Sequence, residues 1–339
     1  MDPADNLPRP SASETYGSNN FPVASDTYVA SDFVLFNHFI TSTSLCLSLR
    51  SQNEAIFPWK TALPTLAPMY PYLLHEVLAV AAIHLHHLHP DDPANYLRIA
   101  CDHQAKALRQ FRDALSPQHA EHQAHALFAC SALMSNYYFA AFDDPASLLF
   151  NQDPSGPPAW ILPIRGCSTL VRQLKNRMFD NSSWTALIGS LSSWSDTAPS
   201  HEMLESDREI QSLESRLDEL SPCEGQLSLY NEDFQLLKRC FRISKKAEDG
   251  SSKIAAMIFA ATVSDEFLHD MSERKRPEAL AIMAFWCVLL SRLDPKCWLR
   301  NESVPQTILS VIESHLSADY LECIQWAVRQ IRSSSTKVT

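Results

Sequence analysis

Glycine is so scarce in this sequence that it restricts the fold before any motif is considered. The 339 residues contain 6 glycines, where ordinary usage of about 7% would give roughly 24. Glycine supplies the positive-φ positions of hairpin turns and strand–helix loops, so its scarcity argues against a β-sheet. Long apolar stretches with helical periodicity are present instead, such as residues 72–87, which should form a central helix. We therefore predict an all-α fold, a multi-helix bundle.

The prolines and polar segments indicate how the chain is organised. Residues 1–27 are rich in Pro, Ser, Asn and Asp, which predicts a disordered tail. One helical domain should follow over residues 28–333, with a weakly patterned insertion at about 180–226 that contains a short helix from about Glu205 to Leu220. The predicted helices cover residues 31–50, 71–87, 93–117, 124–142, 167–178, 205–220, 227–247, 252–269, 277–292 and 303–331.

Charge and composition argue against several classes of function. A net charge of −11 repels phosphate backbones, so we do not expect the surface to bind nucleic acid directly. The apolar runs at 77–88 and 281–290 are shorter than the roughly 20 residues that cross a bilayer, so no membrane span is expected. Nine dispersed cysteines and a polar N-terminus without the features of a secretory signal predict a reduced, intracellular chain.

Histidines are the residues that most invite a metal or catalytic hypothesis. One group crowds the end of the helix at 71–87, and a second recurs at steps of three residues; the two groups are His84, His86, His87 and His89, and His119, His122 and His125. The order His75-Glu76 begins like a zinc-protease helix, but Ala79 stands where the second imidazole is needed. Imidazoles near a helix C-terminus have a structural role. Because no nucleophile elbow or phosphate loop is present either, we predict no catalytic residue, no metal, no cofactor and no enzyme activity.

Two short basic runs stand out in this acidic chain. Steps of one, four, seven and eight residues place the first run on one side of a helix; its members are Lys238, Arg239, Arg242, Lys245 and Lys246. This run could contact an acidic partner or an import receptor, but a solvated helix face is the commoner explanation. Arg274-Lys275-Arg276 is a weak candidate for a nuclear import signal.

Aromatic, sulfur-containing and branched apolar residues gather in the C-terminal third. Phe259 and Val263 lie one helical turn apart, Met283 and Trp286 form a second stripe, and Trp298 follows. Methionine and tryptophan suit an adaptable apolar pocket. They suit an ordinary hydrophobic core at least as well, so the pattern leaves both interpretations open.

Several tracts occur together in an order that carries a family resemblance. Examples are Leu-Leu-His followed by Leu-Ala-Val-Ala-Ala-Ile-His-Leu at 73–85, the Ala-Leu-x-x-Phe-Arg pattern within 103–115, and the tract from Trp160 to Gly166 with its Arg165-Gly166 pair. With residues 33–43 and 126–140, they make residues 30–330 resemble the fungal-specific transcription factor domain. More narrowly, the sequence is similar to the regulatory half of zinc-cluster regulators related to sterol uptake control proteins.

The resemblance implies an all-helical regulatory domain that can dimerise and that holds a lipophilic effector among its C-terminal helices. The pocket residues would be Phe259, Val263, Met283, Trp286 and Trp298, and the family motif would be Trp160, Arg165 and Gly166. Family members carry an N-terminal zinc cluster, but residues 1–45 contain no cysteine. We therefore expect no direct DNA binding by this chain. Its C-terminal tract also departs from the family pattern, which puts an inherited ligand specificity in doubt.

The function predicted on this basis is transcriptional control of a metabolic gene cluster, in the nucleus and shared with the cytoplasm. The chain would act as a homodimer or as a heterodimer with an intact zinc-cluster relative. An alternative is a carrier or sequestering module for a hydrophobic small molecule such as a sterol. A third is that the sequence is the truncated product of a gene whose true start lies upstream.

Overall fold

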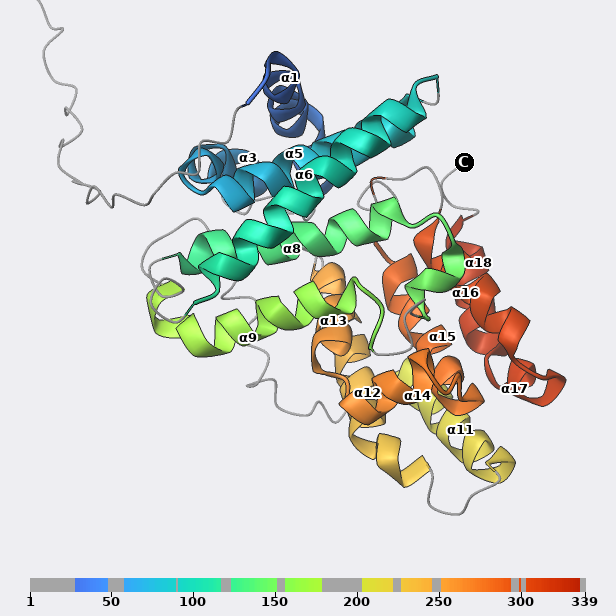
Figure 1. The fold of residues 1–339 in the computed structure, drawn as a ribbon. Helices are drawn as coiled ribbons and strands as arrows, with labels where there is room; N and C mark the ends of the chain where they lie inside the picture. The colour runs from blue at the N-terminus through green and yellow to red at the C-terminus, as the bar shows by residue number, and fades with distance from the viewer. Residues whose placement is uncertain are drawn as a thin grey trace, which may run out of the picture.

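A computed structural model describes residues 28–47, 58–89, 91–116, 123–150, 156–178, 203–221, 227–245, 251–293, 299 and 303–335. Every regular element within these ranges is helical, and none of them contains a strand (Figure 1). The prediction of an all-α fold is therefore confirmed. The predicted tail at 1–27 and most of the predicted insertion lie outside the described residues.

Most helices begin and end close to the predicted positions. Proline occupies the first helical position of three long helices, where its missing N–H costs nothing, and the predicted short helix in the insertion is present as α11. The α-helices are α1 (Ala30–His38), α2 (Ser44–Leu47), α3 (Pro58–Thr61), α4 (Leu63–Leu66), α5 (Pro71–Leu88), α6 (Pro93–Ala114), α8 (Ala124–Ala141), α9 (Ile161–Met178), α11 (Glu205–Leu220), α12 (Asn231–Lys245), α13 (Ser251–Thr262), α14 (Asp265–Ser272), α15 (Pro277–Ser291), α16 (Val304–His315), α17 (Ala318–Cys323) and α18 (Gln325–Ser335). Shorter elements are the π-helix η1 (Phe39–Thr43) and the 3-10 turns η3 (Ala67–Met69), η4 (Pro145–Leu148) and η5 (Leu227–Tyr230).

The helices predicted at 31–50 and 227–247 are divided into shorter elements, α1, η1 and α2, and η5 and α12. Three further predictions differ from the structure. The predicted helix at 252–269 is two helices, because Ser264 ends α13 and caps α14 by accepting a hydrogen bond from the Phe267 N–H at 3.1 Å. The last predicted helix is three shorter ones, α16 to α18. The helix predicted from 167 begins earlier, at Ile161, because Pro163 is tolerated in a first turn.

The buried apolar residues form two clusters that meet at α8 and α9. We call the cluster built on α5 the N-terminal core and the cluster built on α15 the C-terminal core. The two helices lie across the middle of the molecule, between α1–α6 and α12–α18 (Figure 1). Helix α5 is buried along most of its length, so its predicted central position is confirmed for the N-terminal core. Helix α15 is likewise buried along most of its length and is central to the C-terminal core.

Histidines attach the first helices to α5 and α6. The His84 Nδ1 atom lies 2.9 Å from the Thr43 hydroxyl and 3.3 Å from His38 Nε2. Nearer the start of α5, the Nδ1 atoms of His75 and His103 are 3.0 Å apart, and His103 Nε2 lies 3.3 Å from an Asp32 carboxylate oxygen. These imidazoles therefore hold α1 and η1 against α5 and α6, which is a structural role.

Two absences apply to the described residues only. No group of three or more His, Cys, Asp or Glu side chains in these ranges has the geometry of a metal site. No helix in the same ranges is both long and apolar enough to cross a bilayer.

The burial of His84 should make folding stability depend on pH. Burial, with smaller contributions from His38 and His87, lowers the pKa of His84 from 6.5 to about 4. Between these values the unfolded chain binds a proton that the folded chain does not, so the free energy of unfolding should decrease as pH falls from about 6.5 to about 4. A shift of this size corresponds to about 3 kcal/mol. In urea unfolding at about pH 7 and about pH 4.5, His84→Gln should show a smaller decrease than the wild type.

His315→Gln is the matched control, because His315 is an exposed histidine on α16 that does not contact the first helices. This variant should keep the wild-type dependence on pH. If the free energy of unfolding fell equally with pH in the wild type and in His84→Gln, the pH dependence would not come from His84.

Candidate functional site

The tract from Trp160 to Gly166 lies where the two cores meet. It forms the start of α9, a helix that packs against α8 on one side and α13 on another. Trp160, Ile161 and Ile164 belong to the C-terminal core, whereas Leu170, two turns further along the same helix, belongs to the N-terminal core. Helix α9 therefore contributes side chains to both cores, and its first turns form the candidate site.

Trp160 is fixed by stacking and by one hydrogen bond. Its ring lies parallel to that of Trp286, with centroids 5.3 Å apart and an interplanar angle of 8°, and Phe139 of α8 packs 4.7 Å away. The Trp160 indole donates to the Leu148 carbonyl at 2.9 Å, and the Trp286 indole donates to the Ala256 carbonyl at 2.8 Å. Both indole N–H groups are thus satisfied within the core, so burial of the two rings costs no unpaired donor.

Arg165 ties α9 to the turn between α13 and α14. Its guanidinium donates to the Val263 carbonyl and to the Asp265 carboxylate. The Asp265 side chain is 90% exposed, so water screens that ion pair and the carbonyl contact is the more specific of the two. Asp233 of α12 holds the same turn, since its carboxylate accepts from the Ser264 N–H at 2.9 Å and from the Ser264 hydroxyl at 2.8 Å. Burial raises the pKa of Asp233, although these hydrogen bonds oppose the shift.

Gly166 allows α8 and α9 to approach closely. A Cβ atom at this position would lie 2.8 Å from the Ser131 hydroxyl oxygen, inside van der Waals contact. That hydroxyl is buried and donates to the Pro163 carbonyl at 2.9 Å, so it is not free to turn away. The glycine is therefore explained by the distance between two helices, with no need for a positive φ.

The C-terminal residues predicted to line a pocket lie in the core next to this tract. Phe259, Val263, Met283 and Trp286 are each at most 3% exposed and belong to the C-terminal core, and Trp298 lies outside the described residues. The structure brings Trp286 against Trp160 and the Val263 carbonyl to Arg165, while Phe259 packs edge-on against Phe267. This packing is compatible with an ordinary core, so the effector pocket stays a prediction.

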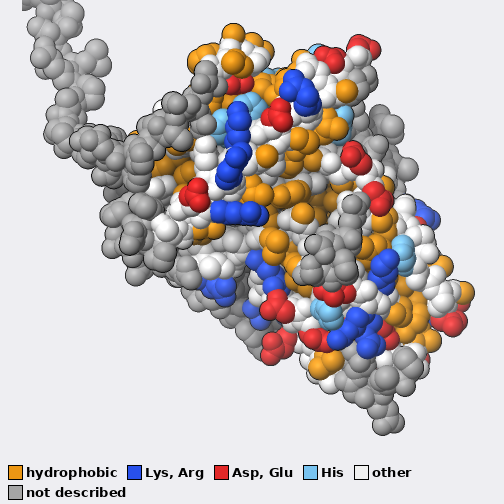
Figure 2. Space-filling model, viewed as in Figure 1, with side chains coloured by type: hydrophobic (Ala, Val, Ile, Leu, Met, Phe, Trp, Pro, Cys, Tyr) orange, Lys and Arg blue, Asp and Glu red, His pale blue; other side chains and the backbone are white. Residues whose placement is uncertain are grey.

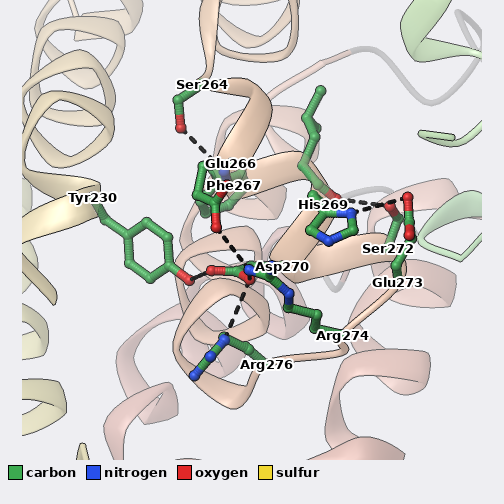
Figure 3. A network of polar contacts seen from close by, with 11 residues as sticks. Tyr230, Ser264, Glu266, Phe267, His269, Asp270, Ser272, Glu273, Arg274 and Arg276 are labelled. Carbon is green, nitrogen blue, oxygen red and sulfur yellow. Dashed lines mark hydrogen bonds and ion pairs between the residues drawn. The ribbon is translucent and has the colours of Figure 1, made fainter. Parts of the chain in front are cut away.

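Asp270 organises a polar network that the sequence did not reveal (Figure 3). Its buried carboxylate accepts from the Tyr230 hydroxyl and from Arg274 at 2.6 Å, and Arg276 lies 3.3 Å away. Lys275 between the two arginines has a φ of 50° and extends over the Phe150 ring. The basic run that is a weak candidate for an import signal therefore shapes the turn between α14 and α15. One part of this network could have been predicted from the sequence, because Asp270 and Arg274 have the i, i+4 spacing of an ion pair on a helix.

The basic run on α12 also has partners within the chain. Lys238 lies 3.2 Å from Glu214 and Arg242 lies 3.1 Å from Asp207, both on α11. Asp207 and Lys238 are largely buried in this contact. At these two positions the basic run packs against α11, where a solvated face was expected. Lys245 is exposed, and Lys246 lies outside the described residues.

Comparisons with known proteins connect these features with a family. Residues 34–194 match the family model of the fungal specific transcription factor domain, a range that contains the tract from Trp160 to Gly166. The chain is also 26% identical over 308 residues to a Zn(2)-C6 fungal-type transcription factor of Gibberella zeae. That alignment covers 87% of this chain and 60% of the relative, so the chain spans less than two thirds of the relative's length.

The two comparisons confirm the resemblance to the fungal-specific transcription factor domain. The narrower similarity to sterol uptake control proteins stays a prediction. A transcription factor domain is not an enzyme class. The predicted pocket residues at 259–298 lie beyond the matched range of the family model. Within the described residues, Trp286 and Val263 contact the tract in α9. The proposed pocket stays a prediction.

Gly166 gives a sharp test of the contact between α8 and α9. Alanine in mid-helix normally adds about 0.5–1 kcal/mol of stability over glycine. Here the clash with Ser131 should reverse the sign, so Gly166→Ala should lower the free energy of unfolding by about 1–3 kcal/mol. In a Ser131→Ala background the same change should become neutral or stabilising. Chemical denaturation of the four proteins measures this coupling.

Gly156→Ala is the control, because a Cβ atom there meets nothing within 4 Å. This change should be close to neutral. If Gly166→Ala lowered the free energy of unfolding equally in the wild-type and the Ser131→Ala backgrounds, α8 and α9 would not meet at this point.

Proposed function

Because residues 34–194 match the fungal specific transcription factor domain, we propose that this chain is the effector-sensing and pairing part of a transcription regulator. In this proposal the protein acts in the nucleus on a metabolic gene cluster. The observation that carries it is the position of the tract from Trp160 to Gly166 at the start of α9. From this position α9 contacts the proposed effector region and contributes side chains to both cores.

The effector proposal rests on the contacts of the C-terminal core with α9. A lipophilic molecule that entered between α13 and α15 would displace packed side chains, of which Met283 is the most adaptable. It would also change the surroundings of Trp286 and Val263, which contact Trp160 and Arg165. Displacement there moves α9, and α9 packs on α8 of the N-terminal core. Occupancy of one core could then be transmitted to the other.

The pairing proposal rests on the surface of α1. Hydrophobic side chains gather over this helix at the top of the view in Figure 2. Phe33 is 70% exposed, and Val29 and Val34 are exposed beside it. Large apolar side chains that cluster on one face of a helix are typical of protein–protein contacts. A second copy of this chain, or an intact zinc-cluster relative, is the partner that we propose for this surface.

Charge supports regulation through protein and effector contacts. The net charge of −11 opposes long-range attraction to DNA. Several cations within the described residues, among them Lys238, Arg242 and Arg274, form ion pairs inside the chain. We therefore propose that this chain reaches DNA through its partner. Sequence-specific retardation of a DNA fragment by the purified chain alone would contradict this part of the proposal.

Titration with a fluorescent sterol, monitored by energy transfer from tryptophan, tests the effector proposal. The wild-type chain should show saturable binding in the micromolar range. Met283→Trp fills the proposed region and should weaken binding by about tenfold, or about 1.4 kcal/mol. Met283→Ala enlarges the region and should preserve or strengthen binding. Met69→Trp, at an exposed position on η3, should leave the affinity unchanged.

Sedimentation of the same samples separates a regulator from a simple carrier. A regulator should change its association state when the sterol binds, whereas a carrier would bind the sterol and sediment as before. Absence of saturable binding, or equal affinities of the wild type and Met283→Trp, would refute the proposed effector site. Exclusion of a fluorescent fusion from the nucleus would favour the carrier.

A further inference from the structure

Three cations on α6 have no ion-pair partner among the described residues. Lys106 is partly exposed and Arg109 and Arg112 are exposed, and within the described part of the chain none of the three forms a hydrogen bond or an ion pair. Arg98, earlier on the same helix, differs because it lies 3.1 Å from Asp102. Lys and Arg side chains follow the course of α6 in Figure 2, with hydrophobic side chains beside them. We call the three unpaired cations the α6 basic surface.

The surroundings of the α6 basic surface do not neutralise it. Residues 103–112 contain no Asp or Glu, and neither do α8, which packs against α6, and α9, which packs against α8. Helix α5 has one carboxyl group, that of Glu76, which is 0% exposed. Burial raises the pKa of Glu76 well above its ordinary value, which favours its uncharged form. Asp113 adjoins the surface, but its single charge leaves the three cations in excess.

The helix dipole explains only part of the α6 basic surface. A cation in the last turn of a helix is stabilised by the partial negative charge at the C-terminus, and Arg112 occupies the last turn of α6. That charge is about half a unit, and its effect falls off within one turn. Lys106 and Arg109 lie more than one turn before the end of α6 at Ala114, so the dipole does not account for them.

Apolar side chains lie beside these cations on the same helix. Leu108, Arg112 and Leu115 follow one another at steps of four and three residues, which places them on one side of the helix. Leu115 at the C-cap is 44% exposed, and Leu108 is partly exposed. Cations next to exposed apolar side chains suit a partner with carboxylates and apolar side chains on one face, which is the pattern of an acidic amphipathic helix.

We propose that the α6 basic surface docks an acidic amphipathic helix of a partner protein. Carboxylates of that helix pair with the three cations, and its apolar side chains pack on Leu108 and Leu115. From Lys106 to Arg112 the helix rises about 9 Å, a length that carboxylates three or four residues apart on a partner helix match. This surface is separate from the α1 surface proposed for pairing and from the effector region in the C-terminal core.

Nucleic acid is the other polyanion that a basic surface could attract. A duplex carries one charge per about 1.7 Å along its axis and extends well beyond the length of the α6 basic surface. Its outer phosphates would meet the remainder of a chain with a net charge of −11, whereas a short peptide would not. An acidic peptide is therefore the better fit.

Peptide titrations of the full chain test the proposal. The probe is a synthetic peptide of about 18 residues, with Glu every three or four residues along one side of the helix and Leu beside them. In titrations followed by NMR of the peptide, it should saturate with a dissociation constant of about 0.1–1 mM. Binding should weaken as the salt concentration is raised. The same peptide with Gln in place of Glu should show no saturable binding.

Charge variants of α6 and α18 show whether the peptide binds at this surface. Arg109→Glu should weaken binding of the Glu peptide about fivefold to tenfold, because an attraction becomes a repulsion, and Arg109→Gln should weaken it less. Arg329→Glu is the matched control, because Arg329 is exposed on α18 and its replacement changes the net charge by the same amount. This control should bind like the wild type, and all three variants should keep the wild-type circular dichroism spectrum.

Four results would each overturn the proposal. They are absence of saturation in the wild type, equal binding of the Glu and Gln peptides, equal losses of affinity in Arg109→Glu and Arg329→Glu, and tighter binding of a DNA duplex than of the Glu peptide.

Discussion

The parallel stack of Trp160 on Trp286 is the interaction on which the rest of this structure depends. Helix α9 has to serve two apolar cores, and the stack places its first turn inside the C-terminal core while its later turns pack with the N-terminal core. The hydrogen bonds of both indoles to backbone carbonyls fix the rings in position. Arg165 and Gly166 then set how closely α9 approaches the α13–α14 turn and α8.

Charged residues in this chain hold helix connections in place. Asp270 gathers Tyr230, Arg274 and Arg276 at the turn between α14 and α15. Lys238 and Arg242 hold α11 against α12. Each of these cations lies beside a carboxylate of the same chain, and the chain as a whole carries a net charge of −11. That net charge opposes long-range attraction to phosphate backbones.

The sequence predicted the fold class well because glycine scarcity and helical periodicity are local properties. The positions of α5, α6, α8 and α11 follow from proline at the first turn and from apolar spacing. The break at Ser264 was missed because it depends on Asp233, which reaches the turn from α12. Likewise the partners of the basic run on α12 come from α11, and no sequence pattern specifies how these two helices pack.

The candidate site was predicted only in part. The family resemblance selected Trp160, Arg165 and Gly166, but the reason for each residue is a tertiary contact with Trp286, Val263 or Ser131. Periodicity placed Phe259 and Met283 on apolar faces without deciding between a pocket and a core, because both require the same residue types.

Hydrogen exchange of the wild type and Trp160→Leu tests most directly whether α9 joins the two cores into one cooperative unit. Loss of the buried ring should cost about 2–4 kcal/mol. If the account is right, amides of α5 and of α15 should lose protection by similar free energies, because both cores depend on the same helix. Loss of protection in α15 with α5 at its wild-type level would contradict it.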